Sequence, residues 1–403
     1  MIEIRHGEPV DPGVVAALRD LWPKVMANPA SGFVRLIDRD DTWESVERRL
    51  EELGSADKVL VIGIGGSSLG TQVIAECFRS SSDTNVFFLE AVDRYKWDQL
   101  RNQGDWRERH IVIISKSGAT LETLSWVERL AHADTSWIKA NKVTVIASAG
   151  NGALQKWAKK ENLPCLWIPE DVGGRFGVLS PVGMFPAGLM GLGRFEFRDG
   201  ARWALSNVDL AANIAAGVLR SWQRNQWITQ LWTYSEALKT FGQWWQQLWS
   251  ESLAKKVDRN GQPAPRVSTP ISCIGPRDQH SLLQQLMEGH PDKHVMLTRV
   301  RSVESAGEAF KAQVFPEMPF YNKTISLGGV LGAEAQAFEQ SLVEAHVPYT
   351  SIELHTLNER TLGATFMLWQ MVIALLGEHL NIDAYNQPGV ELGKRHAEKI
   401  LRQ

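Results

Sequence analysis

The sequence has 403 residues, of which 44% are hydrophobic and 22% charged, and its formal net charge is −3. This composition is ordinary for a soluble globular protein of about two to three domains, and the balanced charge argues against a nucleic-acid-binding protein, which normally carries a basic stripe. No apolar stretch approaches the roughly 18 residues of a membrane span, the N-terminus lacks a secretory-signal pattern, and Cys77, Cys165 and Cys273 form no CxxC pair. We therefore expect a cytoplasmic protein without a zinc site or a disulfide framework.

The first half of the chain alternates strand-like and helix-like segments. After a helical stretch near residues 43–53, strands are predicted at 58–64, 85–89, 110–114, 142–147 and 164–168. Helical patterns lie between them, at residues 70–78, 94–102, from Thr120 onward, and at 153–160. Strands that alternate with helices favour a parallel sheet covered by helices on both faces.

The second half begins after a polar, glycine-rich crossing at residues 171–177. The segment 181–256 is predicted to be helix-rich, because its tryptophans recur at roughly helical spacing, which favours core packing over a ligand-stacking surface. The tryptophans are Trp222, Trp227, Trp232, Trp244, Trp245 and Trp249. Strand-like ISCIG (271–275), HVMLTRV (294–300) and TSIEL (350–354) then predict a second α/β unit, and residues 257–266 form the clearest exposed loop.

A glycine-rich loop, GIGGSSLG at residues 63–70, follows the first predicted strand and opens a helix. Glycines let a backbone approach a ligand closely, and a helix N-terminus offers free N–H groups to an anion. A dinucleotide fingerprint needs a third glycine where Ser68 stands, and a P-loop needs a lysine where Thr71 follows the last glycine. The loop therefore fits a small anion, and a tight turn without a ligand is the alternative.

A second loop, ISKSGATLET at residues 114–123, repeats this arrangement after another strand. Ser115, Ser117 and Thr120 can each donate a hydrogen bond to a phosphate beside backbone N–H groups. Ser117 could instead be a helix N-cap. Because ligands of parallel sheets bind at the carboxyl ends of strands, two such loops at one edge favour a phosphate site.

Three further motifs carry charged residues. Arg175, in GGRF, could stabilise a negative charge that develops during a reaction, or form an ordinary salt bridge. Glu288 ends the apolar face of a predicted helix, where desolvation would raise its pKa toward that of a base near neutrality, although most glutamates at helix ends are solvated. Lys394 closes the polar segment YNQPGVELGK (385–394), as a proton donor, a phosphate contact or a surface lysine.

In chain order these segments resemble the glucose-6-phosphate isomerase family, in its shorter bacterial form. The resemblance runs from GIGGSSLG through SKSGATLET, GGRFGVLSPVG and WWQQLWSES (244–252) to YNQPGVELGK. It implies an α/β fold of two sugar-isomerase domains, each a parallel sheet sandwiched by helices, plus a C-terminal helical arm. We place the first domain with the N-terminal region at residues 1–190, the second at 191–385 and the arm at 386–403. The family interconverts glucose 6-phosphate and fructose 6-phosphate through a cis-enediol, usually as a homodimer, without metal or cofactor.

The same resemblance implies roles for residues at matching positions. Substrate contacts are implied for Gly66, Ser67, Ser115, Lys116, Ser117, Thr120 and Gln387. Glu288 is implied as the base, Arg175 as the group that faces the enediolate, and Lys394 as an aid to ring opening. The family's ring-opening histidine has no counterpart in residues 325–338. His280 in DQHS is a better candidate to replace it than His355, and Lys394 or water is the alternative. Gly177 stands where a hydroxyl residue is common after GGRF, which affects one hydrogen bond and not the reaction class.

Two alternatives to this function stay open. One is a non-catalytic sugar-phosphate-binding protein built on the same domains, which would keep the Ser/Thr loop but need neither Glu288 nor Lys394. The other is an isomerase that also accepts mannose 6-phosphate. No DNA-binding helix-turn-helix extension is evident at either end of the chain, which disfavours a regulator.

Overall fold

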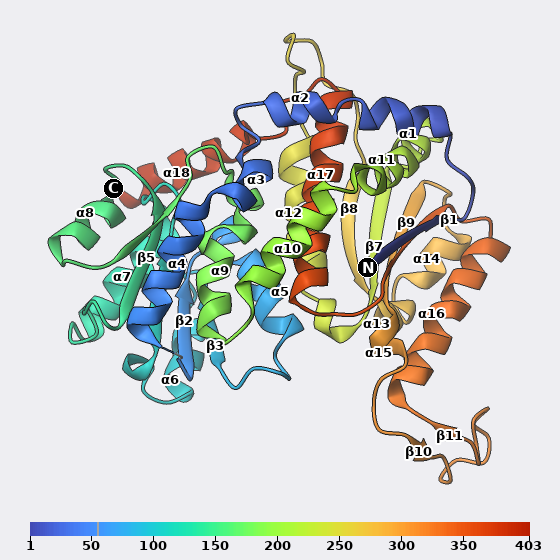
Figure 1. Ribbon diagram of the computed structural model, residues 1–403, viewed down its shortest axis with the longest axis horizontal. Coiled ribbons are helices and arrows are strands. Elements are labelled where there is room, and N and C mark those ends of the chain that lie inside the picture. Colours follow the sequence, from blue (N-terminus) through green and yellow to red (C-terminus); the bar gives the residue numbers. More distant parts are fainter. Residues whose placement is uncertain (55) are drawn as a thin grey trace.

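Five apolar runs of the first half form one fully parallel sheet in the computed structural model, which describes residues 1–54 and 56–403 (Figure 1). The strand order is β3-β2-β4-β5-β6. The strands are β2 (Lys58–Ile62), β3 (Asn85–Leu89), β4 (His110–Ile114), β5 (Val143–Ser148) and β6 (Cys165–Ile168). Every residue of β4 and β5 is buried, as expected for central parallel strands with helices on both faces.

Helices connect these strands and cover the first sheet. They are α4 (Asp40–Leu53), α5 (Leu69–Cys77), α6 (Arg94–Asn102), α7 (Leu121–Ala133) and α8 (Ala153–Lys160). Four elements, β3, α6, β4 and α8, have the bounds that the sequence predicts. Asp93 accepts a hydrogen bond from the backbone N–H of Tyr95 and so marks the start of α6.

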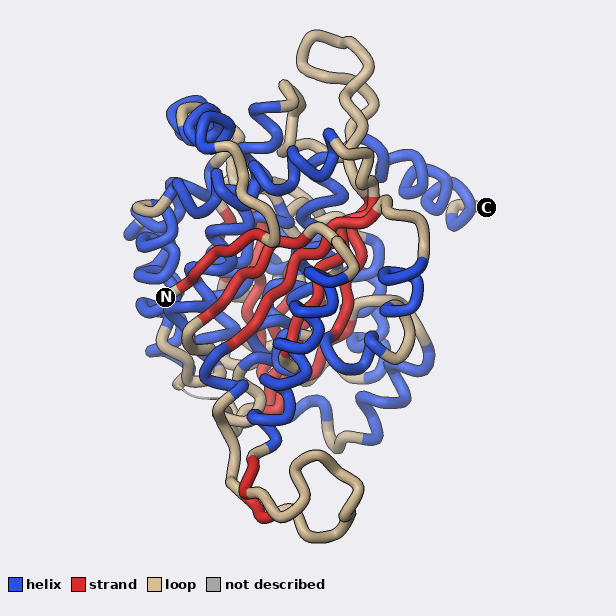
Figure 2. Tube along the Cα trace, turned by 90° about the vertical axis from the view of Figure 1, so that its right-hand side faces the viewer, coloured by secondary structure: helices blue, strands red, loops and turns tan. Residues whose placement is uncertain are grey.

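A second five-stranded sheet lies beside the first and has the order β1-β12-β9-β7-β8. Its strands are β7 (Ile228–Tyr234), β8 (Thr269–Ile274), β9 (Lys293–Val300), β12 (Tyr349–Leu354) and β1 (Ile2–His6). Read from its other edge, the sheet repeats the connectivity of the first for four strands, with β7 in the place of β2 and β9 in the place of β4. The fifth place, that of β6, is taken by β1. Figure 2 shows these strands with helices on either side. The predicted α/β class with two helix-covered parallel sheets is therefore confirmed.

Two details of the second sheet differ from the sequence prediction. The strand β7 lies inside the segment predicted as helix-rich, because ITQLWTY is dense in β-branched and aromatic residues that favour a strand. The N-terminal strand β1, predicted within the first-domain region, pairs antiparallel with β12, with Ile2 opposite Leu354. The boundaries at residues 190 and 385 otherwise stay predictions.

A layer of long helices fills the space between the two sheets. It contains α9 (Pro181–Leu189), α10 (Arg194–Leu205), α11 (Val208–Gln223), α12 (Phe241–Leu253) and α17 (Glu359–His379). The last is long and apolar enough to cross a membrane by length and composition alone, but 94% of its apolar window is buried inside the protein. Trp232, Trp244, Trp245 and Trp249 are each at most 2% exposed, so the predicted core role of these tryptophans is confirmed.

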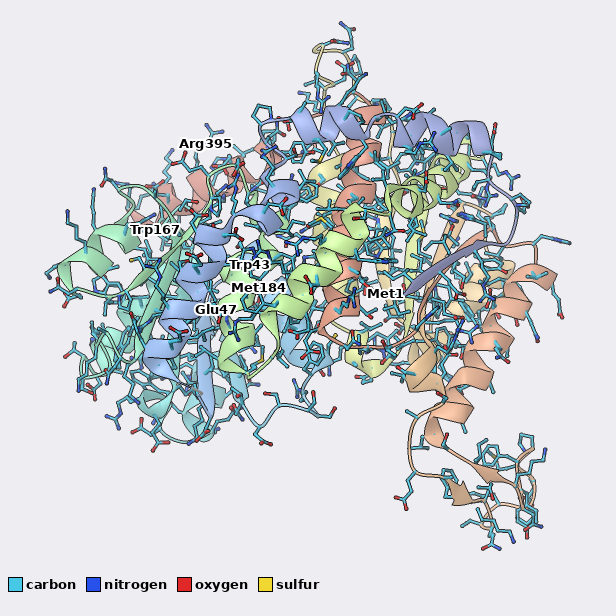
Figure 3. All side chains as sticks on the ribbon, viewed as in Figure 1. Met1, Trp43, Glu47, Trp167, Met184 and Arg395 are labelled. Atoms are coloured by element: carbon cyan, nitrogen blue, oxygen red, sulfur yellow. The ribbon has the colours of Figure 1, made fainter. Side chains whose placement is uncertain are left out.

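The 18-residue helix α16 and a set of shorter elements complete the periphery. They are α1 (Pro12–Arg19), α2 (Trp22–Ala27), α3 (Gly32–Arg35), α13 (Gly275–Gln279), α14 (Leu283–Glu288), α15 (Arg301–Glu304), α16 (Leu327–Glu344), the hairpin strands β10 (Phe310–Lys311) and β11 (Thr324–Ile325), and α18 (Glu391–Leu401). The β10–β11 hairpin projects from the second sheet, and α18 extends toward α8, as the predicted C-terminal arm (Figure 1). In Figure 3, Trp43 and Met184 lie between α4 and α9, whereas Arg395 of α18 is on the surface.

Candidate active site

The two loops that the sequence singles out lie side by side at one edge of the first sheet. They follow β2 and β4, which are hydrogen-bonded neighbours. A Cβ at Gly63 would lie 3.1 Å from the carbonyl oxygen of Ile114, so the loops touch where the strands end. This edge carries the carboxyl ends of parallel strands, where α/β proteins bind their ligands.

The loop after β4 presents its hydroxyls around a tight turn. The Ser115 and Thr120 hydroxyl oxygens are 2.8 Å apart, and Ser115 Oγ also accepts from the backbone N–H of Gly118 at 3.1 Å. Ser117 is exposed and accepts from the N–H of Ala119 at 3.2 Å, so it stabilises the turn, whereas Thr120 is the residue before α7. Together with the N-terminus of α7, these groups can hold a phosphate. Lys116 turns away and donates to the Glu170 carbonyl at 2.9 Å, and burial lowers its pKa.

The loop after β2 approaches the GGRF segment so closely that only glycine fits between them. A Cβ at Gly66 would lie 2.4 Å from the carbonyl carbon of Gly174. Gly65 has a φ of +59°, and a Cβ there would lie 2.9 Å from Nε2 of Gln247. Ser67 is half-buried beside them. The glycines of this loop are therefore required for packing against GGRF and α12, whether or not a ligand is present.

Arg175 is 2% exposed at the start of the helical turn η4 (Gly174–Leu179), and all of its N–H groups have acceptors within the protein. Its acceptors are the Ser252 hydroxyl (2.7 Å), the Glu251 carboxylate (3.3 Å), the Gln387 side chain, and the carbonyls of Ala384 (2.6 Å) and Asn386 (3.1 Å). A guanidinium has five N–H groups, so none is left for another acceptor. Burial lowers its pKa, and Glu251 opposes that shift. In this structure Arg175 therefore organises protein groups; facing a substrate would require it to exchange a partner.

Glu251 is the carboxylate that connects Arg175 to α12, and it is not among the residues predicted from sequence to lie in the site. It lies on α12 with its side chain 27% exposed, receives a 3.0 Å hydrogen bond from Gln247 and pairs with Arg175. The sequence does contain a signal for Glu251. Gln247 and Glu251 are four residues apart, so they share one face of a helix whose other face consists of buried tryptophan and leucine. Lys255 follows α12 and donates to the Glu251 carbonyl at 2.7 Å.

Of the two predicted C-terminal site residues, the structure brings Gln387 to Arg175 but not Lys394. Gln387 lies against Arg175, as described, just before the turn that opens α18. Lys394 is exposed on α18 and pairs with Glu391 at 2.9 Å. Among the described residues it makes no contact with the groups around Arg175.

Glu288 and His280 lie elsewhere, near the second sheet. The helix expected to run from near Asp278 to Glu288 is interrupted between α13 and α14. Glu288 at the end of α14 is exposed and receives a 2.7 Å hydrogen bond from Gln284. The expected desolvation of Glu288 is therefore wrong for this structure. His280 is exposed at the end of α13. In the part of the chain that the structure describes, neither side chain contacts Arg175 or its partners Glu251, Ser252 and Gln387, which together form the Arg175 cluster.

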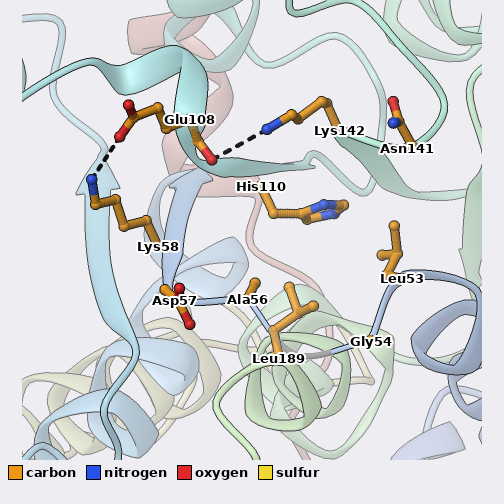
Figure 4. Close-up of a pocket in the computed structure, with 10 residues that line it drawn as sticks. All are labelled: Leu53, Gly54, Ala56, Asp57, Lys58, Glu108, His110, Asn141, Lys142 and Leu189. Atoms are coloured by element: carbon orange, nitrogen blue, oxygen red, sulfur yellow. Dashed lines mark hydrogen bonds and ion pairs between the residues drawn. The ribbon is translucent and has the colours of Figure 1, made fainter.

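Two open cavities lie away from this edge. One, of about 320 Å³, is at the opposite edge of the first sheet, where Glu108 is bonded to Lys58 and Lys142 (Figure 4). The other, of about 390 Å³, is lined by Lys239 and Arg277 among other residues. In both, the cations named here already have partners on the protein.

One group of side chains has the composition of a metal site. Ligand atoms of Glu3, Glu353 and His355 lie within 4.8 Å of one another at the β1 edge of the second sheet. Arg301 pairs with both carboxylates, and His355 bonds Glu3 at 2.6 Å, so ion pairing accounts for the cluster.

Comparison with known proteins identifies relatives along the whole chain. The family described as phosphoglucose isomerase matches residues 41–403. The glucose-6-phosphate isomerase of Methanocaldococcus jannaschii is 31% identical over 400 residues, which cover 96% of each chain. A hypothetical protein from Thermus thermophilus superposes over 100% of both chains with a TM-score of 0.85 and 28% identity. A glucose-6-phosphate isomerase from Chlamydia trachomatis, 21% identical, shares the fold with a TM-score of 0.80 over 99% of this chain and 88% of its own.

Proposed function

Because the chain belongs to the phosphoglucose isomerase family, we infer that it is an aldose–ketose isomerase that interconverts glucose 6-phosphate and fructose 6-phosphate. The observation that carries this inference is the family match over residues 41–403, which includes the whole first sheet, four of the five strands of the second and all the motifs from GIGGSSLG to YNQPGVELGK. The adjoining loops after β2 and β4 supply a place for the phosphate, and the Arg175 cluster supplies charged groups beside it.

Phosphate binding is proposed for the Ser115–Thr120 loop. The exposed Ser117 hydroxyl and the N-terminus of α7 face the same edge of the sheet, and hydrogen bonds to a charged phosphate are stronger than neutral ones. Gly66 and Ser67 would then lie along the sugar. Anchoring the phosphate fixes the reacting carbons relative to the rest of the site. Such positioning lowers the activation barrier relative to the reaction in free solution.

For the base we propose Glu251 in place of Glu288. The reaction needs a carboxylate that removes the C2 proton, forms the cis-enediol and returns the proton to C1. Glu251 lies next to Arg175 and on the helix that contacts the Gly65 loop, whereas Glu288 is exposed near the second sheet. Arg175 is placed to stabilise the charge of the enediolate if substrate displaces Gln387 or Glu251 from it.

Ring opening is proposed for Lys394, with His280 as the second candidate. Both side chains are exposed, and Lys394 would have to leave its partner Glu391, on the same helix, to act on a substrate. The Lys394→Ala variant should lose more activity with the cyclic substrate than with the open-chain form.

We also propose that the protein is a cytoplasmic homodimer that needs neither metal nor cofactor. A surface for a second copy is suggested by the β10–β11 hairpin, where Val314 and Phe315 are 77% and 65% exposed. Sedimentation or light scattering of the wild type and a Phe315→Asp variant would test this assembly.

The activity itself is tested by a coupled assay of fructose 6-phosphate conversion in the presence of EDTA. We expect turnover by the wild type, a loss of at least about a hundredfold in Glu251→Gln, and near-normal rates in Glu288→Gln. Loss in Glu288→Gln alone would return the base to Glu288. Binding of sugar phosphate without turnover would support the non-catalytic alternative, and turnover of mannose 6-phosphate would establish the dual isomerase.

A further inference from the structure

The segment 384–387, which leads from α17 into α18, is held on α12 by two cations. Arg175 donates to the carbonyls of Ala384 and Asn386, at 2.6 and 3.1 Å. Lys255 donates from Nζ to the same Asn386 oxygen at 2.5 Å and to the Glu251 carbonyl at 2.7 Å. One carbonyl oxygen therefore lies between a guanidinium and an ammonium.

Lys255 is placed by its surroundings and has no part in the proton transfers proposed above. It follows the last residue of α12 by two positions, so its side chain can reach both the helix C-terminus and the neighbouring segment. The charged groups that face it are Arg175, Asp383 and Glu251. Asp383 in turn accepts from the backbone N–H groups of Tyr385 and Asn386, at 2.9 and 3.3 Å, and gives the segment its turn.

We propose that Lys255 is a positioning residue, whose ammonium fixes the 384–387 segment on α12 and thereby sets where Gln387 meets Arg175 and where α18 begins. Only its effect on turnover rests on the proposed isomerase function; the attachment of the segment does not. Arg175 holds the segment through the Ala384 and Asn386 carbonyls and the Gln387 side chain, and Lys255 adds a second donor to Asn386 that also ties the segment to the end of α12. The arrangement joins three parts of the chain that are distant in sequence: η4, the end of α12 and the C-terminal segment.

The attachment depends on the proton of Lys255. Burial, with Arg175 as the next cause, lowers the pKa of Lys255 to about 8, while Asp383 and Glu251 oppose the shift. Above this pH a neutral amine keeps a weaker hydrogen bond to Asn386, whereas Arg175 stays charged. The segment should therefore loosen on the alkaline side without detaching completely.

The test compares Lys255→Met with Lys255→Arg, and uses Lys256→Met as a matched control, because Lys256 is the exposed neighbouring lysine. Hydrogen exchange of residues 384–390 should be about tenfold faster in Lys255→Met than in the wild type, and unchanged in Lys256→Met. The kcat/KM for fructose 6-phosphate should fall by a similar factor. Lys255→Arg should restore protection and move the alkaline loss of kcat/KM to higher pH, because guanidinium stays protonated.

Wild-type exchange rates in Lys255→Met would overturn the proposal, and identical alkaline limbs in Lys255→Arg and the wild type would overturn its dependence on the proton. If Lys255→Met fails to fold, the proposal is tested by hydrogen exchange of residues 384–390 at increasing pH. Protection should be lost at a lower pH in the wild type than in Lys255→Arg, and equal profiles would overturn the proposal. An absence of turnover in the wild type would refute the isomerase function. The hydrogen-exchange result would still test whether Lys255 fixes the 384–387 segment.

Discussion

Two buried histidines at equivalent places in the two sheets should make the protein acid-sensitive. His110 begins β4 and bonds Thr144 of β5, with 3.1 Å between Nε2 and Oγ1. His294, the second residue of β9, bonds Thr350 of β12 at 3.2 Å. In each case the threonine pairs across the strands with the residue two positions after the histidine. Burial is the largest cause that lowers the pKa of both to about 3, from 6.5.

Acid should destabilise the folded protein, because burial favours the neutral form of both imidazoles. Between about pH 3 and 6.5 the unfolded chain protonates these imidazoles while the folded protein does not, so stability is complete above 6.5 and falls as the pH falls. At pH 5 the difference from the unfolded pKa is about 1.5 units, which at 1.36 kcal/mol per unit gives about 2 kcal/mol for each histidine. The two together should cost about 4 kcal/mol relative to neutral pH.

Urea unfolding at pH 7.5 and 5.0, followed by tryptophan fluorescence, measures this loss. The change in unfolding free energy should be about 2 kcal/mol smaller in His294→Gln than in the wild type, because glutamine does not titrate. His396→Gln, on the exposed face of α18, should leave the change as it is. Carboxylates contribute equally to all three proteins. An undiminished loss in His294→Gln would show that His294 is protonated in the folded state and would refute the reasoning.

Three further predictions concern the candidate site. Gly66→Ala places a Cβ 2.4 Å from the Gly174 carbonyl carbon, so the loops must separate and kcat/KM in the coupled assay should fall at least about tenfold. Gly393→Ala, which has open space around its Cβ, should leave kcat/KM unchanged. Ser117→Ala should weaken fructose 6-phosphate binding in calorimetry by roughly tenfold to a hundredfold, since a hydrogen bond to a charged group is lost; unchanged affinity would leave Ser117 only its role in the turn. Arg175→Lys provides three donors where five are used, so thermal unfolding should report a loss of about 3–6 kcal/mol, and a wild-type melting curve would contradict the hydrogen-bond network described here.

Local sequence patterns were sufficient to predict most strands of the first sheet. Its strands are short apolar runs between polar turns, so β3 and β4 could be bounded to the residue, and adjacency of the loops followed from the rule for parallel strands. The strand β7 was missed because its tryptophan fitted a helical spacing that began in α11 and continued in α12. The pairing of β1 with β12 joins residues almost a chain length apart, and no local pattern encodes it.

The candidate site shows the same division between local and distant information. The hydroxyl loop was found because its residues are contiguous, whereas Glu251 was hidden in a helix whose apolar residues drew attention to the core. Glu288 was expected to be desolvated because Leu282, Leu283 and Leu286 form an apolar face before it. That face packs on the second sheet, but the end of α14 with Glu288 stays in solvent. That Arg175 has no free N–H depends on contacts from α12 and the C-terminal segment, which only folding brings together.

The position of β1 also sets the order in which the two sheets can be finished during synthesis. The first sheet uses only residues 58–168 and can form while the ribosome is still translating the rest. The edge strand of the second sheet must wait until residues 349–354 have emerged. At about 5–20 residues per second the delay between β1 and β12 is roughly 20–70 s, during which β1 has no partner in the sheet. A fusion that hinders β1 would therefore affect a late step in the assembly of the second sheet rather than an early one.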